Sequence, residues 1–93
     1  MTIGILRVLL FIPESNSLKE KRMVLNSLKK RLRNSFNVSV AQIDQEDKWQ
    51  KAELVIVGVE NKKSQLESML SYVLNFIEGF DKVVLVDYGK ELI

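Results

Sequence analysis

The chain of 93 residues is 46% hydrophobic and 28% charged, carries a net charge of +2, and contains neither cysteine nor histidine. This length and composition predict one globular domain over residues 1–93 and exclude disordered, collagen-like and low-complexity classes. The absence of cysteine and histidine excludes disulfides, thiol nucleophiles, Cys/His zinc sites and Ser-His-Asp triads.

An apolar run rich in Ile, Leu and Val occupies residues 2–12 and is interrupted by Gly4 and Arg7. Pro13 cannot continue a strand ladder, so we expect a buried strand that ends there. The run is too short to span a bilayer, and no small-residue cleavage site follows it. We therefore expect a cytoplasmic protein with no membrane partner.

A helix is expected next, from about Leu18 to Arg33. Ser17 and Glu20 have the spacing of a capping box, in which Ser17 accepts from the N–H three residues on and Glu20 reaches back to the Ser17 N–H. The apolar residues of the segment fall on one helical face, which is typical of a helix packed on a sheet. They are Leu18, Leu25, Leu28 and Leu32, with Val24 at the edge.

The rest of the chain predicts strands at residues 38–44, 50–60 and 82–88, a polar hairpin connection at 45–48, and a second amphipathic helix starting near Asn61 or Ser64. Gly79 suits the left-handed position after that helix, with Phe80 packing back on its last turn. The order βαββαβ with right-handed crossovers predicts an α+β, ferredoxin-like sandwich. Its four-stranded antiparallel sheet would have the strand order 4-1-3-2 and both helices on one face.

Positive charge is concentrated in the first helix. Residues 17–33 hold seven basic residues and one acidic residue, a net charge of +6, whereas the other 76 residues have a net charge of −4. Five cations and Asn26 fall within a sector of about 100° on a helical wheel, beside the leucine face. The cations are Lys19, Arg22, Lys29, Lys30 and Arg33. Such a stripe is either a solvated helix face or a surface that binds a phosphate backbone.

The start of this helix favours the functional interpretation. Lys19, Lys21 and Arg22 lie in the opening turns, where the helix dipole disfavours cations, and backbone N–H groups there can hold a phosphate. Lys21 falls by angle among the leucines, so we expect its stem to lie along the sheet with the ammonium group at the rim. Repeated departures from a local preference point to a functional constraint.

Both faces of the first strand are apolar. Gly4, Leu6, Val8, Leu10 and Ile12 form one set, and the other set is Ile3, Ile5, Leu9 and Phe11 with Arg7 among them. A half-solvated antiparallel strand should alternate, so the second set is either ordinary burial in a central strand or a face covered by a second copy of the chain. In a homodimer, Arg7 would lie near the rim or pair across the interface. The C-terminal residues 91–93 are an alternative cover.

The hairpin region gives weaker indications of function than the first helix. Asp44, Glu46 and Asp47 are expected to be solvated rather than to bind a metal, because no other ligands accompany them. Trp49 can stack on a base, but packing across the hairpin with its N–H bonded to a loop carboxylate is favoured. The first and third strands offer only Phe11 to a base-stacking sheet of the RNA-recognition-motif kind. The loop at 13–17 lacks the glycines of acylphosphatases.

Four motifs resemble the bacterial YlxP-like family over essentially the whole chain. They are SLKEKR at 17–22, RNSFNVSVA at 33–41, D-x-x-D-x-W-Q-x-A-E-L at 44–54 and LNFIEG at 74–79. Many members carry histidine-glutamine between the two aspartates, where this chain has Gln45 and Glu46. The resemblance implies a ferredoxin-like cytoplasmic protein of unassigned function, often encoded beside translation initiation and ribosome-maturation factors, including ribosome-binding factor A.

These observations predict a non-enzymatic accessory protein that binds RNA or a ribosomal subunit, with no catalytic residue, cofactor or metal. The expected phosphate contacts are Lys19, Lys21, Arg22, Lys29, Lys30 and Arg33, with Arg7 and Trp49 as secondary contacts. The alternative is a structural or regulatory homodimer that binds a protein or small ligand through its sheet or loops.

Overall fold

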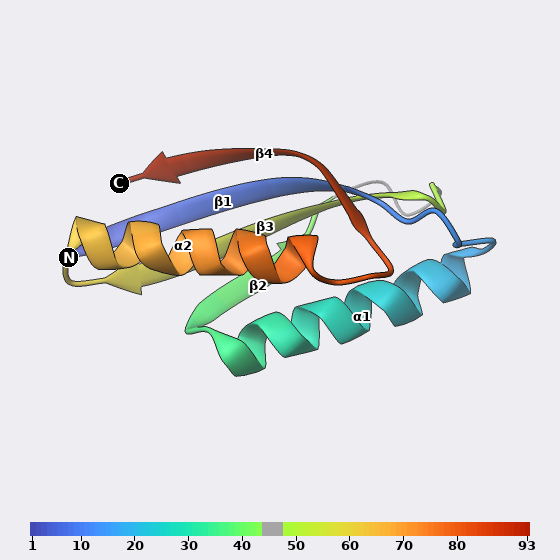
Figure 1. Cartoon of the computed structure of the whole chain (residues 1–93), viewed down its shortest axis with the longest axis horizontal. Coiled ribbons are helices and arrows are strands. Elements are labelled where there is room, and N and C mark those ends of the chain that lie inside the picture. Colours follow the sequence, from blue (N-terminus) through green and yellow to red (C-terminus); the bar gives the residue numbers. More distant parts are fainter. Residues whose placement is uncertain (44–47) are drawn as a thin grey trace.

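Two helices cover one face of a four-stranded sheet in the computed structural model, which describes residues 1–43 and 48–93 (Figure 1). The chain order is βαββαβ, as the sequence predicts. The elements are β1 (Thr2–Phe11), α1 (Leu18–Ser35), β2 (Val38–Gln42), β3 (Lys51–Glu60), α2 (Lys63–Glu78) and β4 (Val84–Leu92). The two termini lie at the same end of the molecule (Figure 1).

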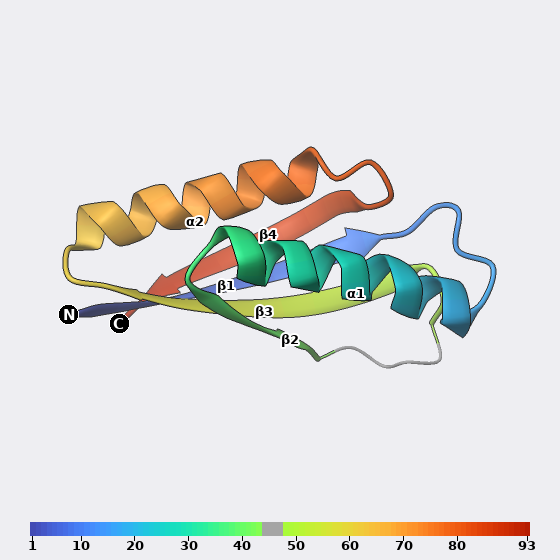
Figure 2. The same ribbon diagram turned by 90° about the horizontal axis from the view of Figure 1, so that it is seen from below.

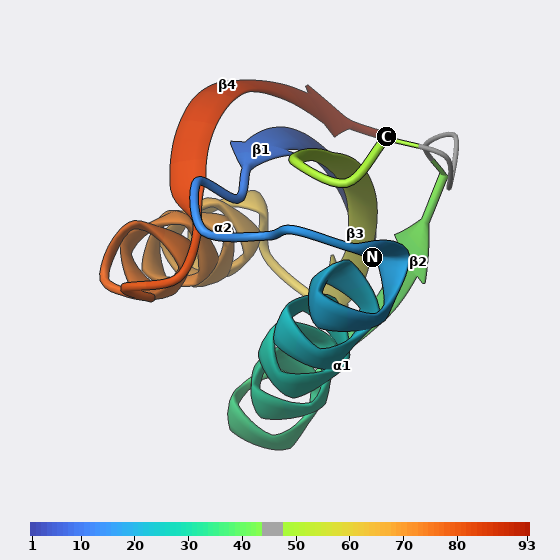
Figure 3. The same ribbon diagram turned by 90° about the vertical axis from the view of Figure 1, so that its right-hand side faces the viewer.

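The sheet has the order β2-β3-β1-β4, and every neighbouring pair is antiparallel. This confirms the ferredoxin-like topology expected from the sequence. Both helices lie on the same side of the sheet, as the end-on view shows (Figure 3). On that side α1 packs toward the β2 edge and α2 toward β1, β3 and β4 (Figure 2). The opposite side, called the open face from here on, has no helix over it (Figure 3).

Alternation along β1 and β3 sorts their side chains between the two sides of the sheet. Leu6, Val8 and Leu10 of β1 and Leu54 and Ile56 of β3 are fully buried under the helices. The apolar stripes of α1 and α2 close the same core. They contribute Leu25, Leu28, Leu32, Leu66, Leu70, Val73 and Ile77.

Two glycines paired across β1 and β3 allow α2 to approach the sheet. Gly4 lies opposite Gly58 in the register. A Cβ at Gly4 would come within 2.9 Å of Leu66 Cδ2 and 3.0 Å of Leu70 Cδ1, and one at Gly58 would collide with the end of the Met69 side chain. The first turns of α2 therefore pack almost directly on the backbone of the two central strands.

Several element ends differ from the sequence predictions. The helix α1 continues two residues beyond Arg33, and β2 ends at Gln42. The predicted hairpin connection lies mostly outside the described residues. The last strand is shifted toward the C-terminus because a turn in which the Val83 N–H donates to the Phe80 carbonyl occupies its expected start. Beyond Leu92, the strand ladder continues through reciprocal backbone hydrogen bonds between Ile3 and Ile93.

The end of α2 contradicts the predicted left-handed glycine. Gly79 has φ −82° and ψ −5°, which is a right-handed conformation, and its N–H donates to the Asn75 carbonyl. The chain leaves the helix through a further turn, in which the Phe80 N–H donates to the Ile77 carbonyl. The Phe80 side chain packs against the buried core.

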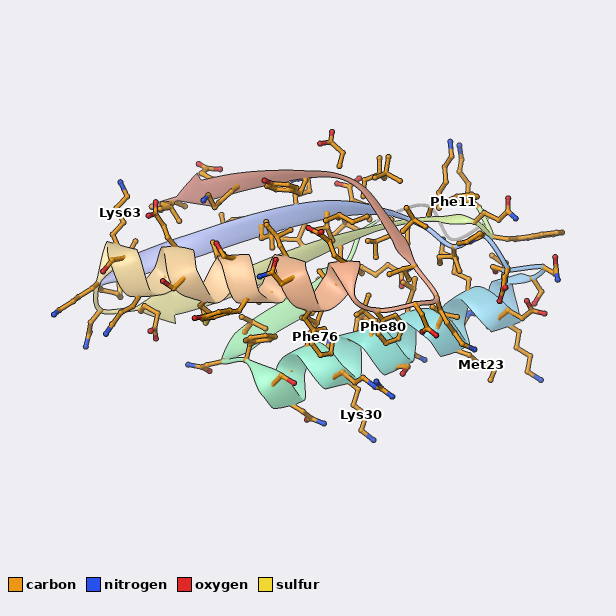
Figure 4. All side chains as sticks on the ribbon, in the orientation of Figure 1. Phe11, Met23, Lys30, Lys63, Phe76 and Phe80 are labelled. Carbon is orange, nitrogen blue, oxygen red and sulfur yellow. The ribbon has the colours of Figure 1, made fainter. Side chains whose placement is uncertain are left out.

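Aromatic contacts bridge α1 and α2. Phe36 and Phe76 meet edge to face with ring centroids 6.1 Å apart, and the Arg31 guanidinium lies 5.7 Å from the centroid of the Phe80 ring. Figure 4 shows Phe76 and Phe80 on the side of α2 that faces α1. The cation–π geometry assigns Arg31 to the seam between the helices.

Candidate nucleic-acid interface

The start of α1 is capped by its own sequence. Ser17 Oγ accepts from the Glu20 N–H at 3.1 Å, which confirms the first half of the capping box. Glu20 reaches one residue further back than expected, because its Oε2 accepts from the Asn16 N–H at 2.9 Å rather than from Ser17. This contact places a carboxylate at the helix start, so the first turn itself is a poor anion site.

Four cations lie along the outer side of α1 and are called the basic face from here on: Lys19, Arg22, Lys29 and Lys30. Lys19, Arg22 and Lys30 are exposed, and Lys29 is half-buried. Figure 4 shows Lys30 directed away from the sheet into solvent. Lys19 and Lys30, at the two ends of the face, are eleven residues apart in sequence, or about 16 Å along the helix axis at 1.5 Å per residue.

The basic face has no acidic partner within residues 1–43 and 48–93. The ion pair found there joins Arg7 to Glu53, on the other side of the sheet. Exposed cations that are not neutralised by neighbouring carboxylates give a surface a positive potential, which attracts polyanions. The basic face therefore has the electrostatic character expected of a phosphate-binding surface.

Lys21 is a correction to the sequence prediction. Its side chain is 2% exposed, and its Nζ donates to the Lys48 carbonyl at 2.7 Å. The ammonium group thus lies under the protein surface instead of at the rim, because a buried cation requires an acceptor and a backbone carbonyl supplies one. Lys21 ties α1 to the segment before β3, and it is not available to a phosphate.

Arg33 has a divided role. Arg33 is exposed, yet its Nη2 donates to the Val40 carbonyl at 2.7 Å. This hydrogen bond links the end of α1 to β2. A guanidinium group has five N–H donors, so this bond leaves others for a further acceptor. We place Arg33 at the margin of the basic face, where a substitution would also disturb the fold.

Arg7 and Trp49, the two secondary contacts predicted from the sequence, lie on different parts of the molecule. Arg7 lies on the open face and bonds Glu53 Oε2 at 2.8 Å, so it cannot contact the same phosphates as α1. Trp49 is 51% exposed and follows Lys48, the residue whose carbonyl holds Lys21. It therefore lies near the first turns of α1. The carboxylates expected to accept its N–H are outside the described residues.

The described residues include a small cleft beside α1 but no cluster that could bind a metal ion. No group of three or more Asp and Glu residues there could hold a metal ion, and Asp44, Glu46 and Asp47 lie outside it. A cleft of about 210 Å³ beside the start of α1 is lined by Glu14, Glu20 and Lys82 together with apolar groups. No helix in these residues is long and apolar enough to cross a membrane.

Sequence comparison reveals relatives over nearly the full length. Residues 3–89 match the family described as "Protein of unknown function (DUF503)". The chain is also 38% identical over 81 residues to "Uncharacterized protein YlxP" of Bacillus subtilis (strain 168), an alignment that covers 87% of this chain and 88% of that protein.

Solved structures with low sequence identity share the fold. The de novo designed protein Foldit4 superposes with a TM-score of 0.55 at 12% identity, covering 100% of this chain and 97% of the design. A mutant of SnoaB, a cofactor-independent oxygenase from Streptomyces nogalater, gives a TM-score of 0.52 at 8% identity over 99% of this chain and 90% of its own. At these identities the similarity concerns the fold alone.

Proposed function

The chain belongs to the DUF503 family of YlxP-like proteins, and we propose that it is a non-enzymatic, cytoplasmic accessory protein that binds the phosphate backbone of RNA through the basic face of α1. The proposal rests mainly on one observation. Lys19, Arg22, Lys29 and Lys30 line one side of a well-capped helix and have no acidic partner within the described residues.

The arrangement favours backbone binding over base reading. Lysine and arginine side chains at an exposed helix face bind phosphates and position a protein, whereas base recognition needs side chains inserted into a groove or stacked on bases. The described residues include Trp49 as one exposed aromatic near the start of α1. We assign it a secondary contact to an unpaired base, which adds to the phosphate contacts without defining a sequence.

A ribosomal RNA or a ribosomal subunit is the proposed target class. Four phosphate contacts predict that the logarithm of the association constant falls with the logarithm of salt concentration with a slope of about −3 to −4. Cosedimentation with ribosomal subunits and filter binding to ribosomal RNA, each between about 50 and 200 mM salt, measure this slope.

A matched pair of charge-reversal variants locates the interface. The first variant changes Arg22, Lys29 and Lys30 to Glu, and the control changes Lys62, Lys63 and Lys90 to Glu. Each alters the net charge equally, and the control positions are exposed residues around α2 and β4. Figure 4 shows Lys63 at the start of α2, pointing away from α1.

We expect the first variant to lose RNA binding and the control to keep most of it. Circular dichroism should show that both variants retain the wild-type fold, because none of the six residues is buried. If both variants bind equally, attraction is due to net charge alone and the basic face is not the site. Retained binding by the first variant would refute the proposal directly.

A further inference from the structure

Most side chains that the two central strands place on the open face are apolar. Ile3, Ile5 and Phe11 of β1 are only partly buried, and Leu9 is 39% exposed. In the β1–β3 register, Ile3 lies opposite Val59 and Ile5 opposite Val57, whereas Val55 lies opposite Arg7. Val59 is 44% exposed. The face also includes Ala41 of β2, which pairs with Val55. Clustered apolar side chains on an uncovered sheet face are typical of an interaction surface.

The chain does not cover this face with its own C-terminus. Ile93 exchanges two backbone hydrogen bonds with Ile3, at 3.0 and 2.7 Å, and so continues the sheet alongside β1. A segment that extends the ladder lies in the plane of the sheet and cannot fold over its surface. The alternative cover suggested by the sequence is therefore wrong.

We propose that the open face binds the same face of a second copy of the chain, giving a homodimer with two sheets packed face to face. The charges on the face fit this occupant. Arg7 and Lys51 lie on it with Glu53, Asp87 and Glu91, so it carries both signs and a slight negative excess. A face that carries both signs can pair opposite charges with its own copy across a two-fold axis, whereas its negative excess gives no attraction for a phosphate backbone. The Arg7–Glu53 ion pair disfavours insertion into lipid.

Arg7 can be covered by a second copy without leaving an unpaired charge. Its side chain is 62% exposed and is bonded to Glu53 within the same chain, so the charge is already partly neutralised before the face is covered. The sequence predicts Arg7 near the rim of a dimer or paired across it, and the structure shows that a counter-charge is already present in its own chain. A hollow of about 290 Å³, lined by Arg7, Leu9, Glu53, Asp87, Tyr88 and Gly89, adjoins the pair. In a two-fold interface the hollow of each copy faces an equivalent region of the other copy.

The available area is sufficient. Each central strand has ten residues. At about 3.4 Å per residue and about 4.8 Å between strands, the 34 strand residues give an outline of about 550 Å² per copy. The total of about 1,100 Å² exceeds the roughly 1,000 Å² that a specific protein interface needs, and two packed sheets about 10 Å apart are a common arrangement.

Mass measurement and thiol accessibility test the dimer on the full chain. We expect light scattering to give twice the 10.7 kDa chain mass at about 100 μM and the monomer mass on dilution into the nanomolar range. Val57→Lys should remain monomeric at all concentrations, because it places an unpaired cation at the centre of the interface. Lys30→Glu, on the outer side of α1, should dimerise like the wild type.

The chain has no cysteine, so a single introduced cysteine can be labelled specifically. Its labelling rate measures how accessible the open face is, even if Val57→Lys fails to fold. The labelling rate of Val55→Cys should fall in proportion to the monomer fraction, whereas Ser71→Cys, at an exposed position of α2, should react equally at all concentrations. A monomeric wild-type chain at about 100 μM overturns the proposal. A dimer in which both thiols react alike also overturns it, because another surface then forms the contact. Neither result bears on RNA binding by α1.

Discussion

Replacing Lys21 separates a structural lysine from the lysines that we propose to bind phosphate. Lys21→Met keeps a long apolar stem in the buried site and removes the ammonium group that donates to the Lys48 carbonyl. A hydrogen bond from a charged donor contributes about 1.5–3 kcal/mol to stability. Since Lys48 is exposed and water can partly replace the lost donor, we expect a loss of about 1.5–2 kcal/mol in the free energy of unfolding.

For a domain of this size, that loss lowers Tm by about 6–16 °C. Urea unfolding followed by far-ultraviolet circular dichroism measures the free energy, and thermal unfolding checks the shift. The matched control is Lys19→Met, because Lys19 is exposed and has no acidic partner in the described residues. We expect Lys19→Met to stay within about 0.5 kcal/mol of the wild type.

Ligand binding should show the opposite pattern. Lys19→Met removes one of the proposed phosphate contacts and should make the salt slope less steep by about one unit, whereas folded Lys21→Met should bind RNA as the wild type does. If Lys21→Met is as stable as the wild type and loses RNA affinity, the reasoning is refuted. The ammonium group would then act on a ligand and not on the Lys48 carbonyl.

The remaining predictions concern packing and capping. Gly4→Ala should destabilise the fold by about 1–3 kcal/mol, because the added methyl group meets Leu66 and Leu70. Gly89→Ala is the control and should not destabilise the fold, because nothing lies within 4 Å of the new Cβ. Denaturant unfolding compares the two variants, and equal stabilities would contradict the close approach of α2. Ser17→Ala should lower the free energy of unfolding by about 1 kcal/mol, because it removes the hydrogen bond that caps α1. Ser71→Ala, in the middle of α2, is the control, and an unchanged unfolding midpoint for Ser17→Ala would contradict the role of the cap.

The sequence was sufficient to predict the order of elements and the strand order of the sheet. Alternation in β1 and helical spacing of leucines in α1 are local patterns, and the crossover rules restrict how such elements assemble. The side on which each β1 residue lies followed from the same alternation. The family resemblance, confirmed by the match to DUF503, required only the sequence motifs.

The roles of individual cations in α1 could not be predicted in the same way. The acceptor of Lys21 is a backbone carbonyl 27 residues later in the chain, and that of Arg33 is a backbone carbonyl of β2. Backbone carbonyls occur at every residue and leave no signature in the sequence. The position of Lys21 among the leucines was the available signal, because a cation directed at a core must find an acceptor there. Only the fold identifies which one.

Proposed RNA binding and proposed dimerisation use opposite sides of the molecule. The helices cover one side of the sheet and the dimer contact the other, so a face-to-face dimer has α1 in both of its outer layers (Figure 3). The two basic faces then lie on opposite sides of the assembly, and one short duplex cannot contact both. A long or folded RNA can contact both, and the second contact then benefits from the high effective concentration that linkage provides. A compact domain with four phosphate contacts per copy would thereby bind a large folded RNA more tightly than a short fragment of it.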